Sequence, residues 1–371
     1  MTNEKRALAC FILPVLRMLY SSDGMTTIRF FPDEKLSDLL IIEPDADIAS
    51  EFAAYLTKNG CKPEDIFVRG LGSFKIDGSD KQTGNSKKTG SDKQTGNGRL
   101  FGKIAIVTGG AQGFGKGIAE AMAAEGAYIT VADMNFEGAS TCAAMLNEQY
   151  GDNTAIAIEV DVSNAESVER MVQDTVLTFG GLDILVSNAG ILIAGNLDDL
   201  SKESFELVTK VNYTGYFLCA KYAAVPMKLQ SSISPGYMMD IIEINSKSGL
   251  EGSNKNFAYA GSKFGGIGLT QSFAMELVEY GIKVNAICPG NFLDGPLWSD
   301  PKRGLFKQYL DSGKVAGAKT TRDVREFYEK KVPLGRGCTI ADVVCALLYV
   351  IEQKYETGQA IPVTGGQVML R

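Results

Sequence analysis

The 371-residue chain contains no histidine. This absence excludes serine–histidine triads, zinc held by imidazole, and any mechanism that relies on a histidine base. Any chemistry must therefore use tyrosine, lysine, serine, aspartate or glutamate. The chain also lacks an excess of positive charge, because 37 basic residues face 44 acidic ones and the formal net charge is −7. Domains that bind nucleic acid are usually basic, so we expect no nucleic-acid partner.

Metal-binding cysteine motifs and membrane-length apolar runs are also missing. The seven cysteines are dispersed without a CxxC spacing, which is typical of buried, reduced thiols in a cytoplasmic protein and predicts no metal site. The apolar run Ala7–Leu16 follows Lys5 and Arg6, but it is too short to span a bilayer and is interrupted by Pro14. Because Arg17 closes it without an A-x-A cleavage pattern, we expect a buried helix or strand and no membrane contact.

Residues 77–99 form the clearest boundary in the chain. They include no aliphatic or aromatic side chain, five of them are glycine, and the segment SDKQTGN occurs twice, at 79–85 and 91–97. Such a stretch cannot bury enough surface to offset its ordering entropy, so it predicts a flexible linker. We therefore expect residues 1–76 to be only weakly coupled to residues 100–371.

Residues 1–76 are typical of a small α/β extension, whose role the sequence leaves unknown. Apolar stretches such as Leu39–Ile42 alternate with polar ones, Ile48–Asn59 is predicted as a helix, and Asp65–Phe74 as a strand that leads into a glycine turn. This part weakly resembles the C-terminal end of a class II sugar aldolase module. Such aldolases hold zinc with histidines, so no aldolase activity is expected of this chain.

Residues 100–371 alternate short apolar runs with amphipathic helical stretches. This alternation predicts an α/β fold, a doubly wound, mostly parallel seven-stranded sheet of the Rossmann type with helices on both faces. The seven predicted strands are Ile104–Val107, Tyr128–Ala132, Ala155–Val160, Ile184–Ser187, Ile241–Asn245, Val284–Cys288 and Ala360–Val363. The clearest helices between them are Gly115–Glu125, Ala165–Phe179 and Ser262–Glu279.

The first of these strands runs directly into a glycine-rich turn that opens a helix. Glycines at such a junction allow a sharp turn and a close approach to a pyrophosphate, which the amides of the helix N-terminus can bind. Asp133 ends the second strand, where a carboxylate accepts both ribose hydroxyls of NAD and repels the 2′-phosphate of NADP. No arginine occurs in 127–140 to favour that phosphate, so the cofactor is predicted to be NAD. The turn residues expected to hold it are Thr108, Gly109, Gln112, Gly113, Phe114 and Gly115.

Tyr259 and Lys263 are four residues apart, which places both side chains on one face of a helix. A lysine ammonium near a tyrosine hydroxyl stabilises the phenolate, so the pair can act as an acid–base unit at neutral pH. Ser246 follows the strand Ile241–Asn245, where its hydroxyl can hydrogen-bond the reacting oxygen of a substrate beyond the carboxyl ends of the strands. Alone, a Y-x-x-x-K spacing is a weak signal.

Four motifs together resemble the short-chain dehydrogenase/reductase family. They are the T-G-x-x-x-G-x-G turn, the N-A-G at 188–190, the V-N-x-x-G at 211–215 and the Y-x-x-x-K motif. The resemblance implies a catalytic tetrad in which Asn212 holds a water that links Lys263 to solvent, beside Ser246 and Tyr259. It also implies a homo-oligomer, a dimer or a tetramer. The remaining cofactor contacts that it implies, from the adenine to the nicotinamide, are Asp161, Val162, Asn188, Ala189, Gly190, Tyr259, Lys263, Pro289 and Gly290.

Within that family, stretches such as INSKSG (244–249) and KVPLGRGC (331–338) are similar to the sorbitol-phosphate dehydrogenases, and this similarity runs from about 102 to 371. It implies interconversion of sorbitol 6-phosphate and fructose 6-phosphate with NAD. Extension 1–100 has no counterpart in that group. Basic residues near the expected site make a substrate phosphate credible, and the candidates to bind it are Lys247, Arg303 and Lys314, with Lys255, Lys302, Lys307 and Lys319 nearby in the sequence.

Two other interpretations stay open. The same chemistry could act on a free polyol or on a 3-oxoacyl thioester. A different class of function is a catalytically silent NAD-binding sensor or scaffold, since fold alone does not decide function. The complete tetrad argues against the second interpretation.

Overall fold

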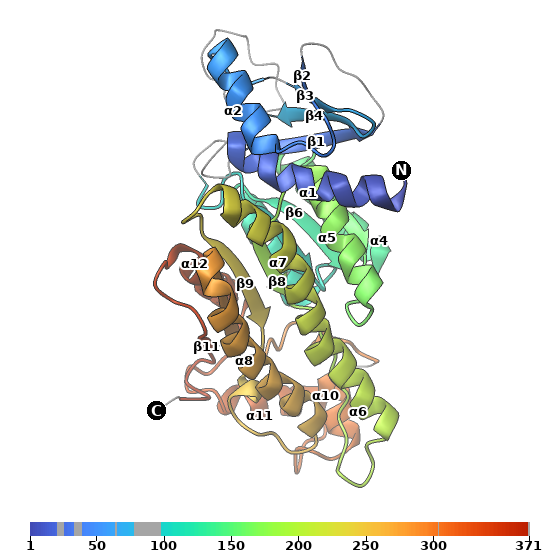
Figure 1. Ribbon diagram of the computed structural model, residues 1–371. Helices are drawn as coiled ribbons and strands as arrows, with labels where there is room; N and C mark the ends of the chain where they lie inside the picture. Colours follow the sequence, from blue (N-terminus) through green and yellow to red (C-terminus); the bar gives the residue numbers. More distant parts are fainter. Residues whose placement is uncertain (21–25, 33–38, 64, 78–97, 303, 370–371) are drawn as a thin grey trace.

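The computed structural model describes residues 1–20, 26–32, 39–63, 65–77, 98–302 and 304–369. A large sheet flanked by helices forms the main body, and a smaller sheet with two helices lies against one end of it (Figure 1). Almost all of the expected linker, residues 78–97 with both copies of the repeated segment, falls outside the described residues.

The main sheet has seven parallel strands in the order β11-β10-β9-β8-β5-β6-β7, which confirms the predicted doubly wound fold. The chain reverses its winding direction between β5 and β8, and ligands of such sheets bind beyond the strand carboxyl ends at this point. The strands are β5 (Ile104–Thr108), β6 (Tyr128–Asp133), β7 (Ala155–Glu159), β8 (Ile184–Ser187), β9 (Met239–Ile244), β10 (Ile282–Pro289) and β11 (Ala360–Val363).

Helices cover both faces of this sheet because its strands are apolar on both sides, as a parallel sheet requires. One face packs against α3 (Gly113–Ala124), α4 (Phe136–Tyr150) and α12 (Ile340–Glu352). The other packs against α5 (Ala165–Phe179), α7 (Gly215–Ile233) and α8 (Phe257–Leu277). The predicted helix Ala165–Phe179 has the observed bounds, whereas α8 begins five residues before the predicted start and so includes Tyr259.

A separate small core lies beyond the strand ends, in the segment between β10 and α12. Trp298 stands at its centre, with ring centroids 4.8 Å from Tyr328 and 5.7 Å from Tyr309. This core fixes the loop that follows the Pro289-Gly290 turn. Its helices are α9 (Pro296–Ser299), α10 (Leu305–Asp311) and α11 (Thr321–Lys330), and α6 (Lys202–Thr209) lies at the same end of the molecule (Figure 1).

The N-terminal extension is an α/β unit, with a four-stranded sheet in the order β1-β4-β3-β2. The predicted helix Ile48–Asn59 is observed with those bounds, the apolar stretch Leu39–Ile42 is a strand, and the predicted strand near Asp65 is a two-stranded hairpin. Its elements are α1 (Asn3–Tyr20), β1 (Thr27–Pro32), β2 (Leu39–Ile42), α2 (Ile48–Asn59), β3 (Asp65–Val68) and β4 (Gly72–Asp77).

The expectation that this extension is weakly coupled to the rest is wrong. Helix α1 packs across α5 and α7, and its apolar side chains, among them Leu13 and Leu16, belong to the same core as those helices (Figure 1). The Arg17 guanidinium donates to both carboxylate oxygens of Asp183, at 2.8 and 2.7 Å, and both side chains are fully buried. Local patterns predicted the apolar run but not its partner, which lies more than 150 residues away.

The extension covers the end of the sheet opposite the predicted site. Arg17 also donates to the carbonyl of Gly102, and Asp183 accepts from the amide of Ile104. These residues precede β5 and β8, so the contact lies at the amino ends of the parallel strands. The extension therefore does not close over the carboxyl ends, where the catalytic candidates lie.

Candidate active site

The turn between β5 and α3 has the geometry of a phosphate-binding loop. Gly109 and Gly113 have φ values of +64° and +60°, which favour glycine. At Gly115 a Cβ atom would lie 2.1 Å from the carbonyl oxygen of Gly109, so only glycine lets α3 approach the turn this closely. Gln112, at the N-cap position of α3, makes no side-chain bond to the helix. The first amides of α3 are thus left for a ligand, and the turn fits a pyrophosphate.

Asn188 and Thr108 join this turn to β8 across the point where the winding reverses. The Asn188 side-chain amide donates to the carbonyls of Thr108 and Gly109 at 2.9 and 3.1 Å. The Thr108 hydroxyl accepts from the amides of Asn188 and Ala189 at 3.0 and 3.1 Å. The expected N-A-G contact therefore lies beside the glycine turn, and Asn188 also holds that turn in place.

Asp133 lies at the end of β6 with its carboxylate against the same turn. Its Oδ2 accepts from the amide of Ala111 at 3.0 Å, and its Oδ1 accepts from the amide of Asn135 at 2.9 Å. Each carboxylate oxygen can accept a further hydrogen bond. The position and the remaining lone pairs fit two ribose hydroxyls of a dinucleotide.

The other expected cofactor contacts lie along the same edge. Asp161 Oδ1 accepts from the amide and hydroxyl of Ser163, which shapes the loop after β7. Val162 packs against α7, where a Cβ atom on Gly215 would lie 3.0 Å from it. The Gly290 amide donates to the carbonyl of Val363, which ties the Pro289-Gly290 turn to β11.

The catalytic candidates are brought together by β9 and α8. Lys263 is buried and its Nζ donates to the carbonyl of Ile244, the last residue of β9, at 2.8 Å. Ser246 follows two residues later and its hydroxyl accepts from the amide of Ser248. Tyr259 lies one turn before Lys263 and is partly exposed. Ser246 and Lys263 therefore meet at the carboxyl end of β9, and Tyr259 lies on the preceding turn of α8.

Asn212 lies in a π-helical turn, Lys210–Thr214, between α6 and α7. Its Nδ2 donates to the Ser262 hydroxyl at 3.1 Å, and that hydroxyl donates to the carbonyl of Tyr259. Its side chain also exchanges two hydrogen bonds with the backbone of Ile191, just after the N-A-G segment. Asn212 thus connects the turn of α8 that carries the tyrosine with the loop expected beside the nicotinamide. Isolated π turns of this kind are frequent at functional sites.

Glu243, which no sequence motif predicted, is buried beside Lys263. Its Oε1 lies 3.6 Å from Lys263 Nζ and has no hydrogen-bond partner among the described residues, while its Oε2 accepts from Asn245 at 2.7 Å. Burial raises the pKa of Glu243 and the Lys263 ammonium opposes that rise. The position of Glu243 between Ile242 and Ile244 in the predicted strand Ile241–Asn245 was the signal that could have found it.

The loop core meets the segment before α8 at Tyr309 and Asn256. The Tyr309 hydroxyl accepts from Asn256 Nδ2 at 3.1 Å, and Asn256 is buried. Burial raises the pKa of Tyr309, the bond from Asn256 opposes the rise, and Tyr259 is close enough to add to it. Asn256 precedes α8, which carries Tyr259, and holds Tyr309 at this end of the helix; neither residue was predicted.

The structure separates the basic candidates of the loop. Lys302 and Lys319 are exposed, and Lys307 forms an ion pair with Asp311 on the surface of α10. Lys314 turns inward instead, with its Nζ 3.9 Å from the centroid of the Tyr309 ring. Lys247 and Lys255 are partly buried, and Arg303 lies outside the described residues.

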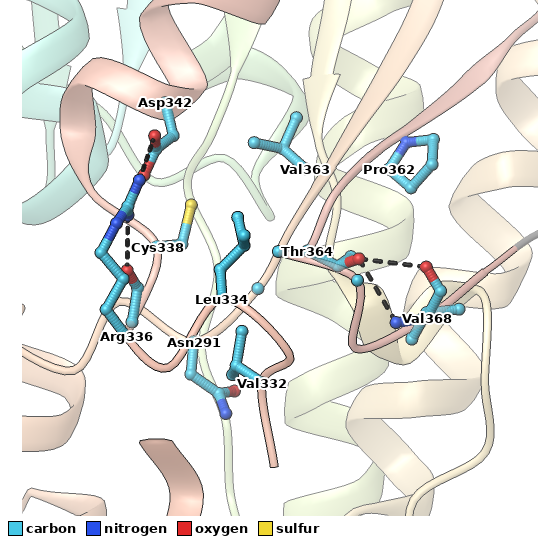
Figure 2. A pocket seen from close by; sticks show the side chains of 14 residues that line it. Asn291, Val332, Leu334, Arg336, Cys338, Asp342, Pro362, Val363, Thr364 and Val368 are labelled. Atoms are coloured by element: carbon cyan, nitrogen blue, oxygen red, sulfur yellow. Dashed lines mark hydrogen bonds and ion pairs between the residues drawn. The ribbon is translucent and has the colours of Figure 1, made fainter. Parts of the chain in front are cut away.

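A cavity of about 310 Å³ lies behind the Pro289-Gly290 turn (Figure 2). It is enclosed by Gly290, Asn291, the loop 332–342 and the C-terminal segment 362–368. The Arg336 guanidinium donates to both oxygens of Asp342 on one side, and the Thr364 hydroxyl bonds the backbone of Val368 on the other (Figure 2). None of the four catalytic candidates lines this cavity.

Other site types find no support among the described residues. They include no group of three metal-ligating side chains, and none of their helices is long and apolar enough to cross a membrane. All seven cysteines are free, but only Cys142, Cys219 and Cys288 are buried, so the expectation of buried thiols is wrong for the other four.

Comparisons with known proteins agree with this geometry. The short chain dehydrogenase family matches residues 103–300. Sorbitol-6-phosphate 2-dehydrogenase of Escherichia coli (strain K12) is 39% identical over 269 residues, which cover 72% of this chain and 99% of that protein. Galactitol 2-dehydrogenase of Agrobacterium fabrum is 33% identical over 274 residues, which cover 73% of this chain and 99% of that protein.

A solved structure is similar over the same share of the chain. The crystal structure of sorbitol-6-phosphate 2-dehydrogenase from Erwinia amylovora is 40% identical in sequence and has a TM-score of 0.66. The match covers 72% of this chain and 100% of that one. The remaining part of this chain thus has no counterpart in that enzyme.

Proposed function

Because this chain belongs to the short-chain dehydrogenase family, a family of oxidoreductases that use nicotinamide cofactors, we propose that it interconverts a secondary alcohol and a ketone on a sugar alcohol or sugar phosphate with NAD. The specific reaction that we propose is sorbitol 6-phosphate to fructose 6-phosphate. One observation carries the proposal: Asn212, Ser246, Tyr259 and Lys263 are linked through β9 and α8 beside a glycine turn that fits a dinucleotide.

Each side chain of the tetrad has a distinct role in this reaction. The Tyr259 hydroxyl, which makes no hydrogen bond within the described residues, takes the proton of the substrate hydroxyl during oxidation and returns it during reduction. Ser246 donates a hydrogen bond to the same substrate oxygen. Lys263 stabilises the phenolate of Tyr259 by its positive charge. A bound nicotinamide supplies the hydride acceptor or donor.

NAD is proposed over NADP because of Asp133. A 2′-phosphate placed at the end of β6 would meet this carboxylate, and no arginine follows in 134–140 to compensate its charge. The carboxylate accepts from two backbone amides, which hold it in place for the ribose hydroxyls.

A polyol phosphate is proposed as the substrate for two reasons. Two relatives, at 39% and 33% identity, are named for a dehydrogenation at carbon 2 of a hexitol or its phosphate. The loop core of this chain also brings Lys314, Asn256 and Tyr309 to the catalytic tyrosine, so polar and cationic groups are available to a charged substrate.

The test is NADH formation by the purified protein with sorbitol 6-phosphate, sorbitol and galactitol, measured by absorbance, with NADP in parallel. We expect kcat/KM with sorbitol 6-phosphate and NAD to exceed the other combinations by at least about tenfold. Equal turnover of phosphorylated and free polyols would favour a free-polyol dehydrogenase. Cofactor binding without turnover of any polyol or 3-oxoacyl substrate would favour a silent NAD-binding protein.

We also propose that the protein is a homo-oligomer. The neighbouring helices α7 and α8 expose large apolar side chains, namely Phe217, Val225, Phe264 and Met275, of which Met275 is 82% exposed. Apolar exposure on two adjacent helices is typical of a surface that a second copy covers. Sedimentation analysis of the protein and of Phe264→Asp should give an oligomer and a smaller species, respectively; a wild-type monomer at micromolar concentration would refute this.

A further inference from the structure

Four lysines on segments distant in the sequence lie close enough for their charges to interact, around Lys314, whose Nζ is 3.9 Å from the Tyr309 ring centroid. One follows Ser246, one precedes α8, one lies between α10 and α11, and one directly follows α11. We call them the lysine cluster: Lys247, Lys255, Lys314 and Lys331.

Positive charge is concentrated in this cluster. Burial, and after it the charges of Lys255, Lys331 and Lys247 in that order of importance, lower the pKa of Lys314 to about 8. Burial likewise lowers the pKa of Lys247. The charge of Glu251 opposes this decrease, and the charge of Lys331 adds to it. Among the described residues, no carboxylate lies within ion-pair distance of any member, and the exposed Glu251 is the only acid that influences Lys247.

The cluster is held in place by aromatic rings and by the backbone. Lys314 Nζ lies 3.9 Å from the Tyr309 ring centroid, and Lys331 Nζ lies 4.3 Å from that of Phe327. Lys255 has a φ of +59°, which is unfavourable for a residue with a side chain, and its carbonyl accepts from the amide of Gly195. Strain of this kind persists only where the surrounding structure maintains it.

An unpartnered polar group lies at the same place. Asn256 is 93% buried, directly after Lys255, and its Nδ2 donates to the Tyr309 hydroxyl. Its Oδ1 is buried and has no hydrogen-bond partner among the described residues. A buried acceptor without a partner costs free energy, so it points to a hydroxyl of a bound molecule next to the lysines.

We propose that the lysine cluster is the subsite for the phosphate of the substrate, with the Asn256 carbonyl oxygen accepting a hydroxyl of its carbon chain. This inference rests on the proposed function; it adds Lys331 to the basic residues that the sequence suggested and, of those, keeps Lys247, Lys255 and Lys314. In the free protein the four ammonium groups repel one another. A bound phosphate dianion offsets this repulsion and accepts charge-assisted hydrogen bonds from several of them. Lys314 and Tyr309 connect the subsite to Tyr259, so a polyol bound by its terminal phosphate reaches the reacting centre with its other end.

The test compares Lys314→Gln and Lys331→Gln with Lys330→Gln, a matched control that removes an exposed charge one residue away. The readout is the ratio of kcat/KM for sorbitol 6-phosphate to that for sorbitol, each with saturating NAD. We expect the ratio to fall roughly 10- to 100-fold in Lys314→Gln, about 3- to 10-fold in the more exposed Lys331→Gln, and less than about twofold in Lys330→Gln. Lys314→Arg, which keeps the charge, should recover most of the loss. Circular dichroism and NAD binding verify that each variant is folded.

A second readout does not depend on turnover. Titration calorimetry of inorganic phosphate into the NAD-saturated protein should show binding in the wild type and in Lys330→Gln, and binding at least tenfold weaker in Lys314→Gln. If a polyol phosphate is turned over but neither the ratio nor phosphate binding changes in the cluster variants, the subsite is wrong and the proposed function stands. If phosphate binding depends on Lys314 but no polyol phosphate is a substrate, the subsite stands and the proposed substrate is wrong.

Discussion

Replacing Arg17 by methionine should destabilise the whole protein, although this residue lies in the N-terminal extension, far from the catalytic candidates. Methionine keeps much of the apolar volume of the arginine stem and removes only the guanidinium. In the wild type that guanidinium donates to Asp183, to the carbonyl of Thr26 and to the carbonyl of Gly102. The variant leaves the fully buried Asp183 without its cation.

The magnitude follows from the burial of the pair. Removing one partner of a buried ion pair costs about 3–5 kcal/mol. Asp183 keeps hydrogen bonds from Ile104, Gln230 and Tyr237, so the lower half of that range applies best. With an unfolding entropy of about 2.1 cal/mol/K per residue, each kcal/mol changes Tm by about 1.3 °C in a chain of 371 residues, which gives a loss of about 4–6 °C for the full range.

The pH dependence identifies the charge as the cause. Burial acts to raise the pKa of Asp183, but Arg17 outweighs it and holds the pKa below the ordinary value. In the wild type this carboxylate therefore contributes stability above about pH 4, which is lost as pH falls through its lowered folded-state pKa. Without Arg17, burial raises the pKa of Asp183. As pH falls, this carboxyl is therefore protonated, and the variant no longer bears the cost of a buried, unpaired charge. The difference in Tm between the two proteins should be larger at pH 8 than at pH 5.

Scanning calorimetry of the full chain at both pH values measures these differences. Arg69→Met is the control, because Arg69 pairs with Glu43 on the surface of the same extension, with both side chains more than half exposed. It should change stability by less than about 1 kcal/mol. A difference that does not vary with pH would refute the electrostatic argument. If Arg17→Met lowered only a small early transition and left the main one unchanged, the shared core of α1, α5 and α7 would not be cooperative.

Four further outcomes are expected. Tyr259→Phe should lower kcat by roughly 10²–10⁴ while NAD binding, measured by fluorescence, persists; more than about a tenth of the activity remaining would remove this tyrosine from the mechanism. Asp133→Ala should reduce the preference for NAD over NADP at least several-fold in kcat/KM, and an unmodified protein that used both equally would contradict the role of this carboxylate. Glu243→Gln removes a negative charge 3.6 Å from Lys263, so the pH–rate profile of alcohol oxidation should move to lower pH; an unchanged profile with reduced stability would indicate a purely structural role. A chain starting at Gly98 should aggregate or melt at least as early as Arg17→Met, because it uncovers the faces of α5 and α7 that α1 protects, and a wild-type melting temperature would contradict this.

Local sequence patterns determined most of the fold and the candidate catalytic residues. The strands Ile184–Ser187 and Ala360–Val363 and the helix Ala165–Phe179 have the predicted bounds, because short β-branched runs and amphipathic stretches between turn residues depend mainly on nearby chain. The glycine turn and the Tyr259–Lys263 pair were also readable, since close backbone approach and one-turn helix spacing leave their signature within a few residues.

Only the tertiary structure decided which distant groups meet. The apolar run of α1 was visible in the sequence, but its packing on α5 and α7 and the Arg17–Asp183 pair join segments more than 150 residues apart. In the same way, Glu243 could be seen as an acid in a strand but not as the neighbour of Lys263. Of the basic residues in the substrate loop, the sequence could not separate Lys314, which turns toward Tyr309, from Lys307, which pairs with Asp311, because the aromatic core around Trp298 sets their directions.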